Sequence, residues 1–102
     1  MSDFNIEPED LQILKDILRI SLDKNVKVSV FGSRARGKSK PFSDLDLAFD
    51  FGRPMSLEEL ANLKFAFEES TLPFSVDLVD LQAIDASFKK IIQQEMKEIF
   101  FI

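Results

Sequence analysis

Three aspartates are spaced so that their carboxylates would share one face of a β-sheet. Asp44 and Asp46 lie in residues 43–51, where polar and apolar residues alternate, and Asp77 has the same polar parity in residues 74–80. Alternate side chains of a strand point to one face, so we expect the three carboxylates opposite the apolar residues. Like charges this close are tolerated best around a cation, and oxygen ligands favour Mg²⁺ or Mn²⁺. The spacing therefore predicts a metal site.

Two further aspartates are weaker candidates for this site. Asp80 has the parity of the core residues and lies at the end of its predicted strand. Asp50 shares the acidic face but lies beyond the pair, so we interpret it as a solvated or supporting residue.

A turn suited to phosphate follows another predicted strand, in the sequence Gly32-Ser33-Arg34-Ala35-Arg36-Gly37. Backbone N–H groups at the start of a helical turn bind phosphate. Gly32 permits close approach, Ser33 adds an N–H and a hydroxyl, and Arg34 and Arg36 can hold phosphate oxygens as forks. Metal-binding carboxylates, a triphosphate turn and a third carboxylate that accepts a proton together predict nucleotidyl transfer.

Helices and strands alternate around these residues. Apolar periodicity predicts helices over residues 8–22 and 57–69, strands over 26–32, 43–51 and 74–80, and a short helical turn with a loop over 33–42. Ser56 with Glu59 forms a capping-box pattern, and Asp85 is a candidate N-cap. The last helix has a long apolar stripe: Phe88, Ile91, Ile92, Met96, Ile99 and Phe100. We expect an α/β fold with a sheet of at least three strands covered by helices on one face.

Length and composition limit the function classes. The chain has 102 residues, 45% of them hydrophobic, with 3 Gly and 4 Pro, which is typical of one globular domain spanning residues 1–102. It has no Cys and no His, which excludes disulfides, thiolate zinc sites and His-based triads. With no signal-peptide pattern and no membrane-spanning apolar run, we expect a cytoplasmic protein.

Charge is unevenly distributed along the chain. The net charge is −5, which argues against general nucleic-acid binding, yet residues 24–43 hold six basic residues and no acid. We interpret four lysines as solvated and Arg36 as functional; the lysines are Lys24, Lys27, Lys38 and Lys40.

Most of the 11 phenylalanines fall on apolar parities and are expected in the core, including Phe31, Phe49, Phe74 and Phe88. Phe65 lies off the stripe of its helix, and Phe101-Ile102 is an apolar chain end. An interface and incidental exposure both remain open for these residues.

The motifs resemble a known family. The run from Phe31 to Gly37, followed by Ser43-Asp44-Leu45-Asp46-Leu47, is similar to the Gly-Ser…Asp-x-Asp signature of the polymerase-β-like nucleotidyltransferase superfamily. Its form, Gly-Ser-x-Ala-Arg-Gly-x5-Ser-Asp-x-Asp-Leu, resembles the minimal nucleotidyltransferase (MNT) branch, and Val76-Asp77-Leu78-Val79 resembles the third metal-binding strand. The resemblance covers nearly the whole chain.

The resemblance implies a mixed sheet of the polymerase-β palm type. It makes Asp44 and Asp46 ligands of Mg²⁺, with two ions expected and Mn²⁺ possible as a substitute, and Asp77 the third ligand or the base. Gly32 and Ser33 would grip the triphosphate of ATP. It implies no firm role for the two arginines of the turn.

The resemblance also implies a partner. MNT proteins resemble antitoxins of HEPN/MNT toxin–antitoxin modules, in which AMP passes from ATP to a tyrosine of an all-helical HEPN RNase toxin. A hetero-oligomer is expected, because about 100 residues leave no room for a second domain that binds the acceptor. Two alternatives remain open: an antibiotic (aminoglycoside-type) nucleotidyltransferase, and an antitoxin that acts by binding only.

Overall fold

The computed structural model describes residues 5–23, 25–40 and 42–101. Lys24 of the basic segment and Ile102 of the apolar chain end lie outside the described residues. Within these described residues, three helices and four strands follow one another: α1 (Pro8–Ser21), β1 (Lys27–Phe31), β2 (Leu45–Asp50), α2 (Leu57–Glu68), β3 (Val76–Asp80), α3 (Ala86–Glu95) and β4 (Lys97–Phe101). None of the described helices has the length and apolar character needed to span a membrane.

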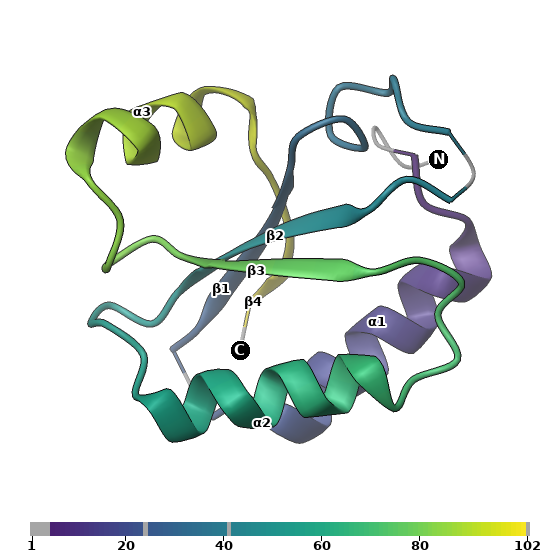
Figure 1. Cartoon of the computed structure of the whole chain (residues 1–102), viewed down its shortest axis with the longest axis horizontal. Coiled ribbons are helices and arrows are strands. Elements are labelled where there is room, and N and C mark those ends of the chain that lie inside the picture. Colours follow the sequence, from purple (N-terminus) through teal and green to yellow (C-terminus); the bar gives the residue numbers. More distant parts are fainter. Residues whose placement is uncertain (1–4, 24, 41, 102) are drawn as a thin grey trace.

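The four strands form one mixed sheet in the order β3-β2-β1-β4 (Figure 1). β1 is antiparallel to both β2 and β4, whereas β2 and β3 are parallel and are joined through α2. Parallel neighbours require a crossover connection, and α2 supplies it. The predicted α/β class and mixed sheet are confirmed.

The main core lies between the sheet and the first two helices. Leu45, Leu47 and Phe49 of β2 have no exposed surface and pack in one cluster with Leu14 of α1 and Leu63 of α2. Pro8 stands in the first turn of α1, and the Ser56–Glu59 capping box starts α2 as the sequence predicts. The predicted alternation of β2 is therefore observed, with its apolar face toward α1 and α2.

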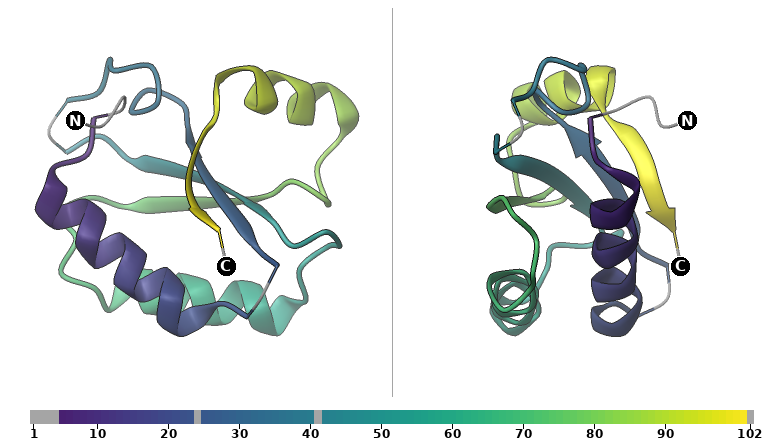
Figure 2. Two further views of the ribbon diagram at one scale, coloured as in Figure 1. Left: turned by 180° about the vertical axis from the view of Figure 1, so that it is seen from behind. Right: turned by 90° about the vertical axis from the view of Figure 1, so that its right-hand side faces the viewer.

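The third helix lies on the opposite face, so the helices do not all cover one face as expected. Figures 1 and 2 show α3 across the sheet from α1 and α2. Ile92 of α3 is buried in a second, smaller cluster with Phe31, Ala48 and Leu81. Ala48 has the polar parity of β2, and its small side chain leaves space for a helix. α3 therefore covers part of the acidic face.

The last helix is shorter than the sequence predicts. α3 ends at Glu95, and the residues after Met96 form β4 instead of continuing the helix. Pairing with β4 satisfies the backbone groups of β1 that would otherwise form a free edge. Ile99 and Phe100 then pack against the main core, while Phe88, expected in the core, is 40% exposed. This pairing joins distant parts of the chain, so helical periodicity could not reveal it.

Candidate active site

Asp46 and Asp77 form a carboxylate pair on the face that carries α3. They are directly opposite each other in the parallel register of β2 and β3. Leu45 and Leu47 on either side of Asp46 are fully buried toward α1 and α2, so Asp46 points to the other face. The Asp46 side chain is half-buried, and Asp77 is exposed. The structure therefore brings together these two predicted residues.

The surroundings of Asp46 disfavour its negative charge. Burial is the largest cause that raises the pKa of Asp46, followed by the charges of Asp77 and Asp44 and a hydrogen bond with Asp77. The positive charge of Arg36 offsets part of this rise. A divalent cation between the two carboxylates would relieve the same repulsion, and their oxygens are donors of the hard type. The pair therefore fits a Mg²⁺ ion.

Asp44 is not gathered with the pair as closely as predicted. It is exposed and precedes β2, which begins at Leu45, so strand alternation does not govern its position. Within the described ranges, no three acidic side chains stand close enough together to ligate one ion. The structure assembles two of the three predicted carboxylates, with Asp44 near enough to influence the pKa of Asp46.

The turn after β1 is packed against the carboxylate pair. Gly32 has a φ of 76°, a left-handed conformation that glycine adopts without strain. A β-carbon at this position would overlap Oδ2 of Asp46. The turn closes when Arg36 N donates to the Gly32 carbonyl (3.1 Å) and Lys38 N donates to the Ser33 carbonyl (2.9 Å). The predicted helical turn is thus a single turn, and Gly32 allows it to reach Asp46.

Arg34 does not have the placement expected of a phosphate ligand. Its side chain is buried, with Nη1 donating to the Asn5 carbonyl (2.6 Å) and Nη2 to the Ser43 carbonyl (2.7 Å). Its guanidinium lies 4.2 Å from the centre of the Phe74 ring. Arg34 therefore ties the turn to the N-terminal segment and to the residues before β2. The sequence shows that Arg34 lies two positions after Gly32, but it does not show the direction of the Arg34 side chain.

Arg36 points toward the site, and its partner is a residue that the sequence analysis missed. Arg36 Nη1 donates to Oε2 of Glu95 (3.0 Å), and the backbone N–H of Gly32 donates to Oε1 of the same carboxylate (2.9 Å). Glu95 is the last residue of α3 and lies more than 55 residues from the turn. The available signal was an acid in the last turn of a helix, where the helix dipole disfavours it.

The weaker acidic candidates have structural contacts. Asp50 accepts hydrogen bonds from Gln82 Nε2 (2.9 Å) and Gly52 N (2.8 Å). Burial alone would raise the pKa of Asp50, but these bonds and nearby lysines lower it overall. Asp80 accepts from Met55 N (2.7 Å) and Gln82 N (3.0 Å), so it holds loops at the sheet edge.

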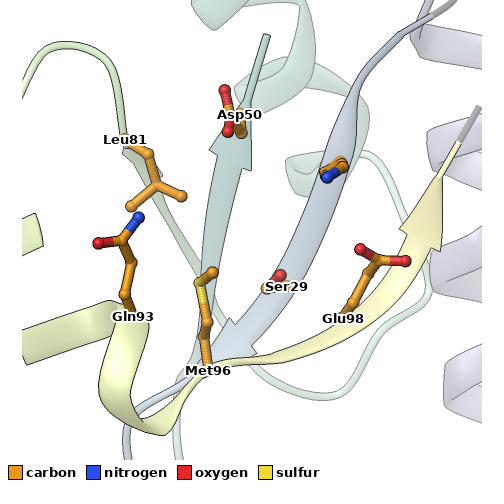
Figure 3. Close-up of a pocket in the computed structure, with 7 residues that line it drawn as sticks. Ser29, Asp50, Leu81, Gln93, Met96 and Glu98 are labelled. Carbon is orange, nitrogen blue, oxygen red and sulfur yellow. The ribbon is translucent and has the colours of Figure 1, made fainter. Parts of the chain in front are cut away.

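A hollow of about 330 Å³ lies beside α3 on the same face but away from the carboxylate pair. Figure 3 shows Ser29, Asp50, Gln93, Met96 and Glu98 around it. Lys27, which also lines it, pairs with Asp50 at one end of β1 and β2, whereas Asp46 pairs with Phe31 at the other end. The hollow is therefore separate from the candidate active site.

Residues 10–101 match the family described as polymerase beta, nucleotidyltransferase. The chain belongs to this family. The enzyme class predicted from the motifs, a nucleotidyltransferase, is confirmed. The assignment also agrees with the geometry above, in which a glycine turn and a carboxylate pair meet on one face of a mixed sheet.

Relatives of this nucleotidyltransferase carry more specific names. It is 42% identical over 90 residues to "Probable protein adenylyltransferase MntA" of Haemophilus influenzae, covering 88% of this chain and 78% of that protein. It is 36% identical over 89 residues to a protein adenylyltransferase homologue of Methanocaldococcus jannaschii, covering 86% and 95% of the two chains.

A solved structure has the same fold. A chain in a crystal structure described as a toxin–antitoxin with AMP-PNP has a TM-score of 0.75 to this nucleotidyltransferase. The two chains are 22% identical, and the match covers 90% of this chain and 73% of that chain.

Proposed function

We propose that this nucleotidyltransferase transfers AMP from ATP to a tyrosine hydroxyl of a HEPN toxin. By this modification it acts as the antitoxin. The observation that carries the proposal is the Asp46–Asp77 pair held against the Gly32 turn. The 42% identity to a protein named as an adenylyltransferase supports AMP as the transferred group. One structure of the same fold is described as a tri-AMPylated HEPN toxin with an MNT antitoxin, at 18% identity and a TM-score of 0.70.

Each part of the site has a role in this proposal. The carboxylates of Asp46 and Asp77 would hold Mg²⁺, and Asp44 would join them only after its exposed side chain turns toward the pair. Bound Mg²⁺ supplies positive charge that neutralises the triphosphate. The N–H groups of Gly32 and Ser33 and the Arg36 guanidinium bind the phosphate oxygens. Arg34 is left out of the phosphate ligands because its guanidinium is bonded to backbone carbonyls.

The transfer step requires one base and one leaving group. The acceptor hydroxyl oxygen forms a bond to the α-phosphorus of ATP while the bond from that phosphorus to the bridging oxygen breaks. Pyrophosphate leaves, and the hydroxyl proton passes to the carboxylate of Asp77, which is exposed on the face that carries α3. The acceptor must approach within about 3.5 Å in line with the leaving oxygen, so a docked partner has to present it.

The test is to mix the purified protein with its cognate HEPN protein, ATP and Mg²⁺ and to measure the intact mass of both chains. We expect AMP adducts on the HEPN chain, lost with Asp46→Asn. Asp50→Asn is the matched control, because it removes the same charge from the same face of β2, where Asp50 is bonded to Gln82 and Gly52. The control should keep its transfer activity.

Two other results would replace this proposal with one of the alternatives. A complex that neutralises the toxin while neither chain gains mass would favour an antitoxin that acts by binding only. Adenylylation of an aminoglycoside, with the HEPN chain unmodified, would favour an antibiotic nucleotidyltransferase.

A further inference from the structure

Glu95 occupies the donors of the turn to which the proposed function assigns phosphate. One carboxylate oxygen accepts from the backbone N–H of Gly32 at 2.9 Å, and the other accepts from Nη1 of Arg36 at 3.0 Å. The contact joins the end of α3 to the loop after β1, and Figure 2 shows these two segments side by side. A single side chain from a distant part of the sequence therefore uses two anion-binding groups of the turn.

The position of Glu95 follows from the pairing of β4 with β1. Lys97 pairs with Val30 in this antiparallel ladder. Two residues before Lys97 and two residues after Val30, the same register brings Glu95 to Gly32. Met96 has an extended conformation, with φ −67° and ψ 148°, so the helix ends immediately after Glu95. Glu95 is thus held at the turn by the backbone on its C-terminal side.

The location is unfavourable for an acid on α3 itself. The C-terminal end of a helix carries partial negative charge, and the last turn of α3 contains no basic residue. The two charge-assisted hydrogen bonds to the turn offset this cost. Without these two hydrogen bonds, the Glu95 carboxylate would lie uncompensated at a helix C-terminus. The turn and Glu95 therefore stabilise each other in the absence of another anion.

A carboxylate oxygen and a phosphate oxygen are the same kind of acceptor for these donors. The backbone N–H of Gly32 has one hydrogen to donate, so Glu95 and a phosphate cannot both take it at full strength. The side chain of Glu95 is 26% exposed and has rotatable bonds, so it can turn toward solvent while α3 and β4 stay in place. Displacement of Glu95 therefore needs only a change of side-chain rotamer.

We propose that Glu95 competes with the nucleotide triphosphate for the Gly32 N–H and the Arg36 guanidinium, and that it thereby sets the affinity of the protein for nucleotide. This rests on the proposed nucleotide site at the turn. A protein whose binding-competent form is only partly populated binds its ligand more weakly by that fraction. Glu95 keeps the turn ordered in the free protein and lowers its affinity for ATP.

Calorimetric titration with ATP and Mg²⁺ tests this competition. We expect Glu95→Ala to bind ATP about tenfold more tightly than wild type, because the two hydrogen bonds of Glu95 no longer have to be broken. Glu95→Gln should bind with intermediate affinity, since a neutral amide oxygen is a weaker acceptor. Glu98→Gln is the matched control for charge, because Glu98 lies on β4 beside Ser29. It should stay within about twofold of wild type.

A second measurement follows the Gly32 amide by NMR. In the free protein its resonance should shift on Glu95→Ala but not on Glu98→Gln, and ATP should shift it in every protein that binds. Equal or weaker ATP binding by Glu95→Ala than by wild type would overturn the competition while leaving the nucleotide site intact. Absence of binding to wild type and to all variants would overturn the proposed function together with this inference.

Discussion

Gly32 is the residue at which the fold and the candidate site are most closely connected. Its left-handed backbone starts the turn, and its missing side chain leaves the space that the Asp46 carboxylate fills. Gly52 has nearly the same φ, 74°, but among the described residues no atom beyond its chain neighbours lies within 4 Å of the position of a β-carbon. Alanine substitutions at the two glycines therefore distinguish the cost of backbone strain from the cost of losing the close approach of Gly32 to Asp46.

We predict that Gly32→Ala is more destabilising than Gly52→Ala. The left-handed conformation alone costs a residue with a β-carbon about 1–2 kcal/mol, which both variants share. Gly32→Ala must in addition displace Asp46, so it should also weaken ATP binding. Urea unfolding and ATP titration of both variants measure this difference. Equal destabilisation with unchanged ATP affinity would show that the approach to Asp46 is unimportant.

The position of α3 matters most at the scale of the elements, because this helix covers the acidic face and carries Glu95. Ile91 and Ile92 are neighbours on it, yet Ile92 is 1% exposed and Ile91 is 58% exposed. We predict that Ile92→Ala lowers the free energy of unfolding by about 2–5 kcal/mol. Ile91→Ala should change it by less than about 0.5 kcal/mol. Thermal or urea unfolding of the two variants checks the placement; similar losses would mean that α3 does not pack as described.

The contacts of Glu59 at the start of α2 predict how the stability of the protein depends on pH. Two hydrogen bonds from Arg53 and one from Ser56 N lower the pKa of Glu59 from 4.5 to about 2. Folding therefore favours the charged form, and this stabilisation is complete above pH 4.5 and lost as the pH falls toward 2. The stability difference between wild type and Glu59→Gln should narrow over that range.

Unfolding curves recorded at several pH values measure the Glu59 effect. Glu58→Gln serves as the control for loss of a charge from the same helical turn. A difference between wild type and Glu59→Gln that stays constant from neutral pH to pH 2 would count against the Arg53–Glu59 contact.

The charge of the whole molecule opposes the binding of a polyanion. The net charge is −5, and the Asp46–Asp77 pair lies where the triphosphate would approach. We predict that ATP binds at least about tenfold more weakly when Mg²⁺ is removed with a chelator. In Asp46→Asn the effect of Mg²⁺ should be smaller, because one proposed ligand is gone. Calorimetry in both conditions gives the result, and equal affinities for wild type would eliminate the metal role.

Local patterns in the sequence determined several structural features of this protein. The alternation of residues 43–51 predicted which face carries Asp46, and the same parity placed Asp77 opposite it. The capping box of α2, the Asp85 cap of α3 and the turn at Gly32 were also predicted correctly. These features depend on residues a few positions apart, where strand and helix geometry fix the direction of each side chain.

Only the tertiary structure decided the features that join distant segments. Residues 97–101 form a strand because β1 offers an unpaired edge, although their apolar spacing also suits a helix. Arg34 turns inward because backbone carbonyls of Asn5 and Ser43 meet its guanidinium, and Glu95 reaches the Gly32 turn because β4 pairs with β1. The partner of a hydrogen-bonding group depends on which segments pack together, and this information is not present in the local periodicity of the chain.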